Sequence, residues 1–243
     1  MNKNIKKALV IGGNAIIISS MLGSPIDSNV LDAANINNEV DIVIRAGEYP
    51  DKCGKRLVGI DENFNINCPI RYDKETGYHV QEYDLNYLVS LRIVEYLKEK
   101  GVNVVLQETK DRTEDLNSAG RKAKKLSPKI YFSVHHNSYD KNSTGLFFMT
   151  NVGDSQSAKY AKNMSNAMTD NPMLIPIMEN RTNVNNYIGE MNQRAGKVNI
   201  LGEFGFALSN PDEAKKCADE KQLDYIAEKI GNELIKILKE INN

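Results

Sequence analysis

Short β-branched runs alternate along this chain with stretches of helical periodicity, and this alternation limits the fold more than any other feature. The predicted strands are residues 41–44, 102–106, 130–134, 146–150 and 198–204. Between and after them lie predicted helices at 82–100, 117–126, 155–168 and 223–241. Alternating strands and helices predict one α/β domain with a mostly parallel, twisted sheet flanked by helices.

The first long helix has a clear end and a consequence for topology. Leu88, Leu91, Val94 and Leu97 repeat at helical spacing, and Gly101 supplies the C-terminal stop. The strands before and after this helix then form a strand–helix–strand unit, which favours a parallel pair. No repeat and no second domain is visible in the sequence.

The N-terminus differs in character from the rest of the 243 residues. Lys3, Lys6 and Lys7 precede an apolar run at 8–22, which is shorter than the about 20 apolar residues of a spanning helix. We expect residues 1–34 to be a signal peptide or N-terminal anchor plus linker, with Ala33-Ala34 as the nearest cleavage candidate. A buried N-terminal strand or helix is the alternative, but it leaves the lysines unexplained. The domain at 40–243 would be secreted or held at the outer face of the cytoplasmic membrane.

Charge and cysteine content bear on which partners and metal ligands the chain can have. Lys+Arg total 31 and Asp+Glu 32, so no net charge favours binding to nucleic acid. We expect the protein to be a monomer. Cys53 and Cys68 lie within a loop insertion at 49–78, and a disulfide between them could close the loop that they bracket, a crosslink worth about 3 kcal/mol. Cys217 is expected on a helix as a small buried hydrophobe. The lack of a C-x-x-C pair argues against a thiolate zinc site.

Polar residues stand where the strands end. Glu48 follows the first strand, His135 ends a central one, Glu203 lies at the end of the last, and Glu82 begins the first long helix. In open α/β sheets, ligands bind at the carboxyl ends of the strands, and a helix N-terminus favours an anionic side chain. Three carboxylates and a histidine on one rim can hold a zinc ion and activate a water.

These segments resemble the zinc-dependent N-acetylmuramoyl-L-alanine amidases of bacterial cell-wall hydrolases and phage endolysins. The resemblance covers nearly all of residues 40–241. Its most specific piece is Glu203-Phe-Gly-Phe-Ala-Leu-Ser-Asn-Pro211, and Ser133-Val-His-His-Asn137 comes second. It implies a fold like that of zinc peptidases, one Zn²⁺ per site, Glu82 and His135 as ligands, and Glu203 as general base. Peptidoglycan is the implied substrate, cut between N-acetylmuramic acid and L-alanine of the stem peptide.

The family's first ligand is a His that closes a D-x-G-H-G motif, and here the stretch reads Arg45-Ala46-Gly47-Glu48-Tyr49. Three interpretations of Glu48 follow. It ligates the metal itself, which would suit Mn²⁺ somewhat better; His79 swings in to replace the missing nitrogen; or Arg45 pairs with Glu48 and no metal binds. If Glu48 is a ligand, its carboxylate should lie within about 4 Å of the ligand atoms of Glu82 and His135.

The residues beside the motifs have less defined roles. Strand alternation points His136 away from His135, so we expect His136 to be a packing or rim residue. Asn137 either holds a hydrogen bond behind the site or ends the strand, and Arg121 either contacts substrate or is solvated.

Three functions remain open on the sequence alone. The first is a peptidoglycan amidase. The second is a non-catalytic relative that binds peptidoglycan, or regulates an active amidase, without a metal, and its support is Arg45 with Glu48. The third is another zinc amidohydrolase or carboxypeptidase, against which the run from Glu203 to Pro211 argues.

Overall fold

A computed structural model describes residues 40–48, 82–108, 115–137, 139–140, 142–169 and 189–243. Residues 39–243 form one compact unit. The expected N-terminal segment, the insertion at 49–78 with Cys53 and Cys68, and His79 lie outside the described residues. Among the described residues, no helix has the length and apolar character needed to span a bilayer.

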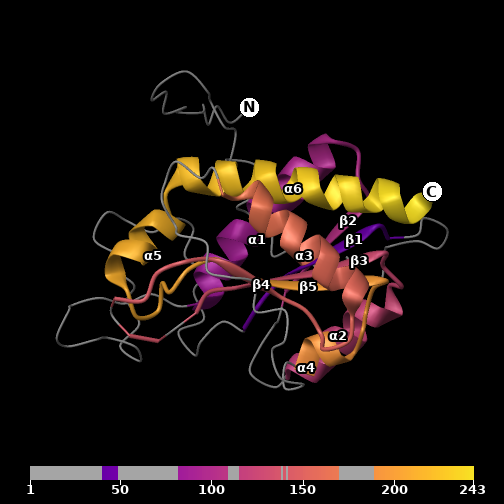
Figure 1. Ribbon diagram of the computed structural model, residues 1–243, viewed down its shortest axis with the longest axis horizontal. Helices are drawn as coiled ribbons and strands as arrows, with labels where there is room; N and C mark the ends of the chain where they lie inside the picture. Colours follow the sequence, from indigo (N-terminus) through magenta and orange to yellow (C-terminus); the bar gives the residue numbers. More distant parts are fainter. Residues whose placement is uncertain (1–39, 49–81, 109–114, 138, 141, 170–188) are drawn as a thin grey trace, which may run out of the picture. The chain divides into compact units, whose positions relative to one another are not determined.

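The strands of the described chain build one five-stranded sheet in the order β2-β1-β3-β5-β4 (Figure 1). They are β1 (Ile42–Ala46), β2 (Val104–Gln107), β3 (Ile130–His135), β4 (Phe147–Met149) and β5 (Val198–Glu203). The first four in this order are parallel, and β4 joins the edge antiparallel to β5. The predicted α/β class and the parallel pair of β1 and β2 are confirmed.

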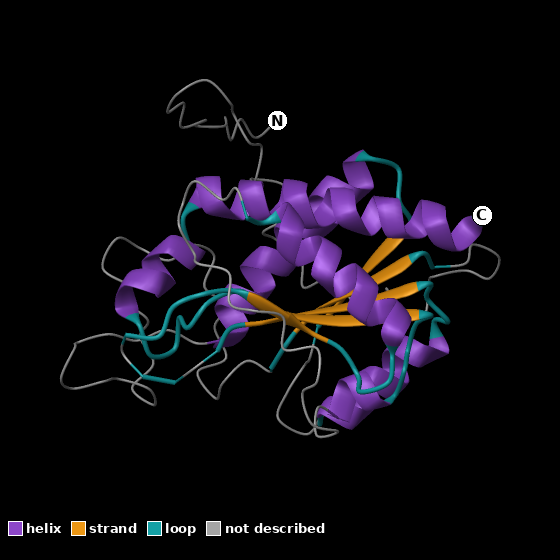
Figure 2. Ribbon diagram, in the orientation of Figure 1, coloured by secondary structure: helices purple, strands orange, loops and turns teal. Residues whose placement is uncertain are grey.

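Helices cover both faces of the sheet (Figure 2). They are α1 (Glu82–Glu99), α2 (Leu116–Lys125), α3 (Ser155–Ala167), α4 (Gly189–Asn192), α5 (Pro211–Cys217) and α6 (Glu220–Asn242). Helices α1, α2, α3 and α6 were predicted, and Cys217 was expected on a helix, which is α5. Helix α4 was not predicted, because a single turn is too short for periodicity to reveal.

Local chemistry sets several helix ends. After α1, Gly101 adopts a φ of 75°, and Val102 N donates to Leu97 O at 3.0 Å, which closes the helix as predicted. Asp154 begins α3 by accepting from Ser157 N at 2.9 Å. Asn210 does the same for α5, where Pro211 follows at a position that needs no N–H donor.

The two faces of the sheet pack against separate apolar clusters. Helices α1, α3 and α6 cover the larger cluster, whose strand residues include Ile44, Phe132 and Ile200. Helices α2 and α4 cover the smaller one, which includes Val43, Tyr131 and Leu201. Successive residues of one strand go to opposite faces, as the pleat requires. Cys217 lies buried in α5 beside the larger cluster, as predicted.

Candidate active site

Three parallel strands end side by side at the carboxyl edge of the sheet. His135 pairs in register with Glu203 across β3 and β5, and Ala46 pairs with Val134 across β1 and β3. The ladder continues past the strands, because Gly47 N donates to Val134 O at 2.9 Å. This register brings the ends of β1, β3 and β5 to one edge, and Glu82 at the start of α1 faces it.

Glu48, Glu82 and His135 come together at this edge of the sheet. One potential ligand atom from each lies within 4.8 Å of the other two, somewhat wider than the expected 4 Å. Within this trio, Glu82 Oε1 is 3.1 Å from His135 Nδ1. Two ligand atoms that share one ion at about 2.0–2.1 Å are separated by about 3 Å, so this pair is already at a suitable spacing.

The backbone at Gly47 and Glu48 is shaped to fit His135. A Cβ atom added at Gly47 would lie 2.4 Å from the His135 ring, so only glycine allows the ring to pack there. Glu48 has a φ of 61°, a left-handed conformation that is uncommon for a residue with a side chain. Such backbone strain tends to persist at functional sites.

Glu82 is held in place by neighbours that donate to it. His136 N donates to Glu82 Oε1 at 3.3 Å and Asn86 Nδ2 at 3.2 Å. Burial acts to raise the pKa of Glu82, but its hydrogen bonds and the charge of His135 lower that pKa overall. Glu82 is therefore ionised and aimed at His135.

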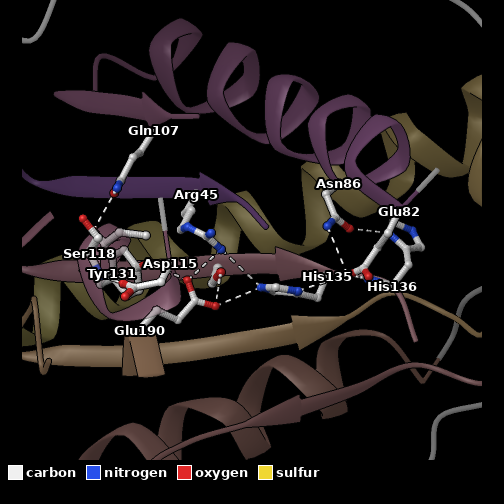
Figure 3. A network of polar contacts seen from close by, with 12 residues as sticks. Arg45, Glu82, Asn86, Gln107, Asp115, Ser118, Tyr131, His135, His136 and Glu190 are labelled. Atoms are coloured by element: carbon white, nitrogen blue, oxygen red, sulfur yellow. Dashed lines mark hydrogen bonds and ion pairs between the residues drawn. The ribbon is translucent and has the colours of Figure 1, made fainter. Parts of the chain in front are cut away.

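His136 supports Asn86 and does not join the trio of potential ligands. Its Nδ1 lies 2.8 Å from Asn86 Oδ1, and burial lowers its pKa to about 3, so the ring is neutral (Figure 3). Because Asn86 donates its amide to Glu82, its carbonyl must accept from His136 Nδ1–H. The buried packing position agrees with the prediction for His136.

Glu203 is a buried carboxylate with a raised pKa at the end of β5. Burial raises its pKa to about 7, while the charge of His135 acts in the opposite direction. Its Oε2 is buried and has no hydrogen-bond partner among the described residues. A carboxylate that is desolvated and unpaired, next to potential metal ligands, is suited to accepting a proton from water at neutral pH.

Glu190 is a functional candidate that the sequence analysis missed. Its side chain is fully buried on α4, and its Oε1 lies 2.8 Å from His135 Nε2 (Figure 3). Arg45 forms an ion pair with Glu190 at 2.8 Å, and both side chains are at most 1% exposed. Burial opposes ionisation of Glu190, but Arg45 and His135 lower its pKa to about 2. The available signal was an arginine directly after a predicted buried strand, because a charge that becomes buried there needs an acidic partner.

His135 is thus placed between two carboxylates. Burial acts to lower its pKa, but the hydrogen bonds and charges of Glu190 and Glu82 raise it well above its ordinary value. Burial also raises the pKa of Glu48, and the Glu82 carboxylate adds to that rise. Three anionic side chains around one imidazole make an environment that attracts a cation.

Two further residues lie outside this arrangement. Arg121 is 56% exposed on α2, and its guanidinium lies 3.8 Å from Asp115. Asn137 continues the β3 edge through its main chain, where its N–H donates to Gly205 O at 2.7 Å.

The donor set fits a divalent cation. Two carboxylates and one imidazole are suitable ligands for Zn²⁺ or Mn²⁺. Beside them, Glu203 Oε2, which has no hydrogen-bond partner in the described part of the chain, can accept a proton. An α/β sheet that carries this set at its carboxyl edge has the arrangement of a hydrolase that activates water.

Comparisons with known proteins identify the family. The family described as N-acetylmuramoyl-L-alanine amidase matches residues 71–236. The chain belongs to this family, and it is accordingly an amidase that acts on the peptidoglycan of the cell wall. The matched region includes Glu82, His135, Glu190 and Glu203, and it begins after Arg45 and Glu48.

Solved structures show the same fold. The amidase AmiC2 of Nostoc punctiforme is 20% identical, with a TM-score of 0.60 over 83% of this chain and 98% of that one. An amidase from Clostridium difficile 630 is 22% identical, with a TM-score of 0.62 and the same coverage of both chains. The catalytic domain of CwlV from Bacillus (Paenibacillus) polymyxa var. colistinus is 22% identical, with a TM-score of 0.59 over 82% and 98%. Among curated proteins, none matches.

Proposed function

We propose that this chain hydrolyses the amide between N-acetylmuramic acid and L-alanine with Glu48, Glu82 and His135 holding one divalent cation and Glu203 acting as general base. The observation that carries the proposal is the convergence of three potential ligand atoms within 4.8 Å, next to a buried carboxylate with a pKa of about 7. Zn²⁺ is the expected ion, with Mn²⁺ as the alternative for a site that contains two carboxylates.

Glu203 and the ligands divide the chemical work. A bound cation would supply Lewis-acid polarisation of the scissile carbonyl and of a water molecule. Glu203 accepts a proton from that water as it attacks the carbonyl carbon, and it then delivers the proton to the leaving amine of L-alanine. Glu82 is kept ionised and oriented by Asn86, so that its carboxylate points toward His135.

The metal-free alternative loses its main support. It depends on Arg45 pairing with Glu48, whereas Arg45 forms its buried ion pair with Glu190. Glu48 contributes an atom to the trio of potential ligands. These contacts favour Glu48 as a ligand over the interpretation in which the site lacks a metal.

Five proteins test the proposal: the natural chain, Glu48→Gln, Glu48→His, Glu203→Gln and the control Glu228→Gln, which alters an exposed carboxylate on α6. Bound metal is measured by elemental analysis, and activity by release of stem peptides from purified cell wall. We expect Glu203→Gln to keep metal and lose activity by about 10²–10⁴-fold. Glu48→Gln should lose both, and the control should lose neither.

Two results would contradict the proposal. The first is a natural chain that has neither bound metal nor activity, together with a Glu48→His variant that has both. This would show that Glu48 occupies a ligand position without binding the metal. Release of single amino acids in place of stem peptides would indicate a carboxypeptidase.

We also propose that the N-terminal segment at 1–34 exports the domain or anchors it at the outer face of the membrane, because peptidoglycan lies outside the cytoplasm. The basic residues before the apolar run at 8–22 support this. Fractionation of cells and N-terminal sequencing of the mature protein would check it. Full-length protein in the cytoplasmic fraction would contradict it.

A further inference from the structure

Glu190 is a buried carboxylate whose two oxygens are both fully used. Its Oε1 accepts from Ser133 Oγ at 3.0 Å and lies 2.8 Å from His135 Nε2. Its Oε2 accepts from Tyr131 Oη and from Arg45 Nη1, each at 2.8 Å. Four polar contacts of this kind fix a carboxylate in one orientation and offset the cost of burying it.

The strands explain why these groups meet. Tyr131, Ser133 and His135 alternate along β3 and therefore project from one face of the sheet. Arg45 lies opposite Ser133 in the register of β1 and β3, so its side chain leaves the same face. Helix α4 covers this face and presents Glu190 to all four residues. Figure 3 shows Glu190 beside Arg45, Tyr131 and His135.

The two nitrogens of His135 face opposite electrostatic environments. Beyond Nε2 lies Arg45 Nη1 at 3.4 Å, a permanent positive charge that repels a cation. Beyond Nδ1 lies Glu82 Oε1 at 3.1 Å, in the trio that includes Glu48. Only the Nδ1 side can receive a metal ion.

We propose that Arg45 and Glu190 form a positioning pair for His135: Glu190 accepts the Nε2–H, so that when a cation replaces the proton on Nδ1, the Nδ1 lone pair points toward Glu82 and Glu48. The inference rests on the metal site of the proposed function. A carboxylate that accepts from the second nitrogen of a ligating histidine fixes the ring and increases its basicity.

Arg45 has its own part in this pair. Its guanidinium binds Glu190 Oε2 and compensates the negative charge of the carboxylate. Glu190 therefore stays ionised and remains a hydrogen-bond acceptor for His135. Without this partner, Glu190 would be a third anionic side chain, beside Glu48 and Glu82, that could compete for the cation. The arginine that departs from the family's D-x-G-H-G motif therefore has a function in this chain together with Glu190.

Glu190→Gln is a sharp test because glutamine has one acceptor and one donor end. Arg45 and Tyr131 both donate on the Oε2 side, so the amide oxygen must lie there and the NH₂ group must face His135. An NH₂ donor at Nε2 selects the other tautomer, in which Nδ1 carries the proton. The ligating lone pair is then lost although the shape of the side chain is kept.

The experiment measures Zn²⁺ affinity by competition with a chelator and the His135 tautomer by ¹⁵N NMR of the ring in the Zn²⁺-loaded protein. For the natural chain we expect a proton on Nε2. For Glu190→Gln we expect binding weaker by about 10–100-fold. Arg45→Met should weaken Zn²⁺ binding, because it removes the charge that holds Glu190. Arg45→Lys keeps the positive charge and should recover part of that lost affinity. Glu233→Gln, which alters a largely buried carboxylate on α6, should leave affinity and tautomer unchanged.

Glu190→Gln removes the carboxylate that pairs with the buried charge of Arg45, so it can fail to fold. The double variant Arg45→Met/Glu190→Gln contains no such charge and would take its place, with the same expected loss of affinity. If the natural chain binds Zn²⁺ and the variants bind it within twofold of the natural affinity, or if His135 carries its proton on Nδ1, the positioning role is wrong while the proposed function stands. If the natural chain binds no Zn²⁺ or Mn²⁺, the metal site falls, and the positioning role falls with it.

Discussion

The two faces of the sheet use the same strands for different purposes. On the face under α1, α3 and α6, the strand side chains are apolar, and Phe132, Phe148 and Phe204 contact one another with ring centroids 6.1–6.3 Å apart. On the face under α2 and α4, the carboxyl half of β3 instead carries Ser133 and His135, which meet the buried Glu190. The first face stabilises the fold through apolar packing. On the second face, polar side chains take the place of some apolar ones and form a fixed hydrogen-bond network.

This difference teaches where a departure from the family motif can be tolerated. A charge introduced on the aromatic face would find no partner among the apolar side chains there. On the other face, Arg45 has Glu190 at 2.8 Å. The substitution is therefore accommodated by a face that already handles buried polar groups.

The largest expected effect lies on the aromatic face. Phe132→Ala should lower the free energy of unfolding by about 3–5 kcal/mol, because it removes a fully buried ring between Phe148 and Phe204. Urea denaturation would measure the loss. Zn²⁺ affinity of the folded variant should stay within a few fold of the natural value. A small loss of stability with a large loss of affinity would break the division between the faces.

Glu203, at the edge of the sheet, should make the free energy of unfolding depend on pH. Its pKa is about 7 in the folded protein and near 4.5 when unfolded, so the folded state retains the proton more strongly. The resulting contribution to stability is fully present below pH 4.5 and is lost as the pH rises through 7. For the metal-free protein this loss is up to about 3 kcal/mol.

Glu203→Gln removes this titration. The variant should therefore be more stable than the natural chain at pH 8 by about 2–3 kcal/mol, and nearly equal to it at pH 4.5. Urea denaturation of both metal-free proteins at the two pH values would test this. An equal difference between the two proteins at both pH values would show that Glu203 is not held in a desolvated site.

Much of the fold could be read from the sequence because its signals are local. The apolar spacing of Leu88 to Leu97 and the stop at Gly101 depend on neighbours in the chain, and α1 forms there. Helix α4 could not be found in this way. Its four residues are defined by packing against α2 and β5, and propensity summed over one turn carries almost no information.

The sequence indicated the candidate metal ligands but not the residues that hold them in place. Glu48, Glu82 and His135 stand at the ends of elements, where topology alone brings them to one edge. Glu190 lies 55 residues from His135 in the sequence, and it meets Arg45 only after β1, β3 and α4 have packed. A contact that depends on three elements leaves no pattern in any one of them.

The smallest expected effect compares one tyrosine hydroxyl from each face. Tyr131→Phe removes one of the donors to Glu190, at 2.8 Å in a fully buried network. Tyr160→Phe removes a donor to Glu240, at 3.1 Å near the surface, where Lys159 Nζ also lies 2.9 Å from the same oxygen. Both substitutions delete the same atom from a buried ring, so their difference isolates the network.

Tyr131→Phe should cost about 1–2 kcal/mol, because a charged buried acceptor loses a hydrogen bond. Tyr160→Phe should cost about 0.5 kcal/mol or less, since water can replace the lost hydroxyl at Glu240. Only the first should also weaken Zn²⁺ binding, by a few fold, since Glu190 would hold His135 less firmly. Thermal denaturation with and without Zn²⁺ measures the loss of stability and the loss of Zn²⁺ affinity in each variant. If the two variants lose the same stability and neither loses affinity, the hydroxyl of Tyr131 does not act on the site in a way that the hydroxyl of Tyr160 does not.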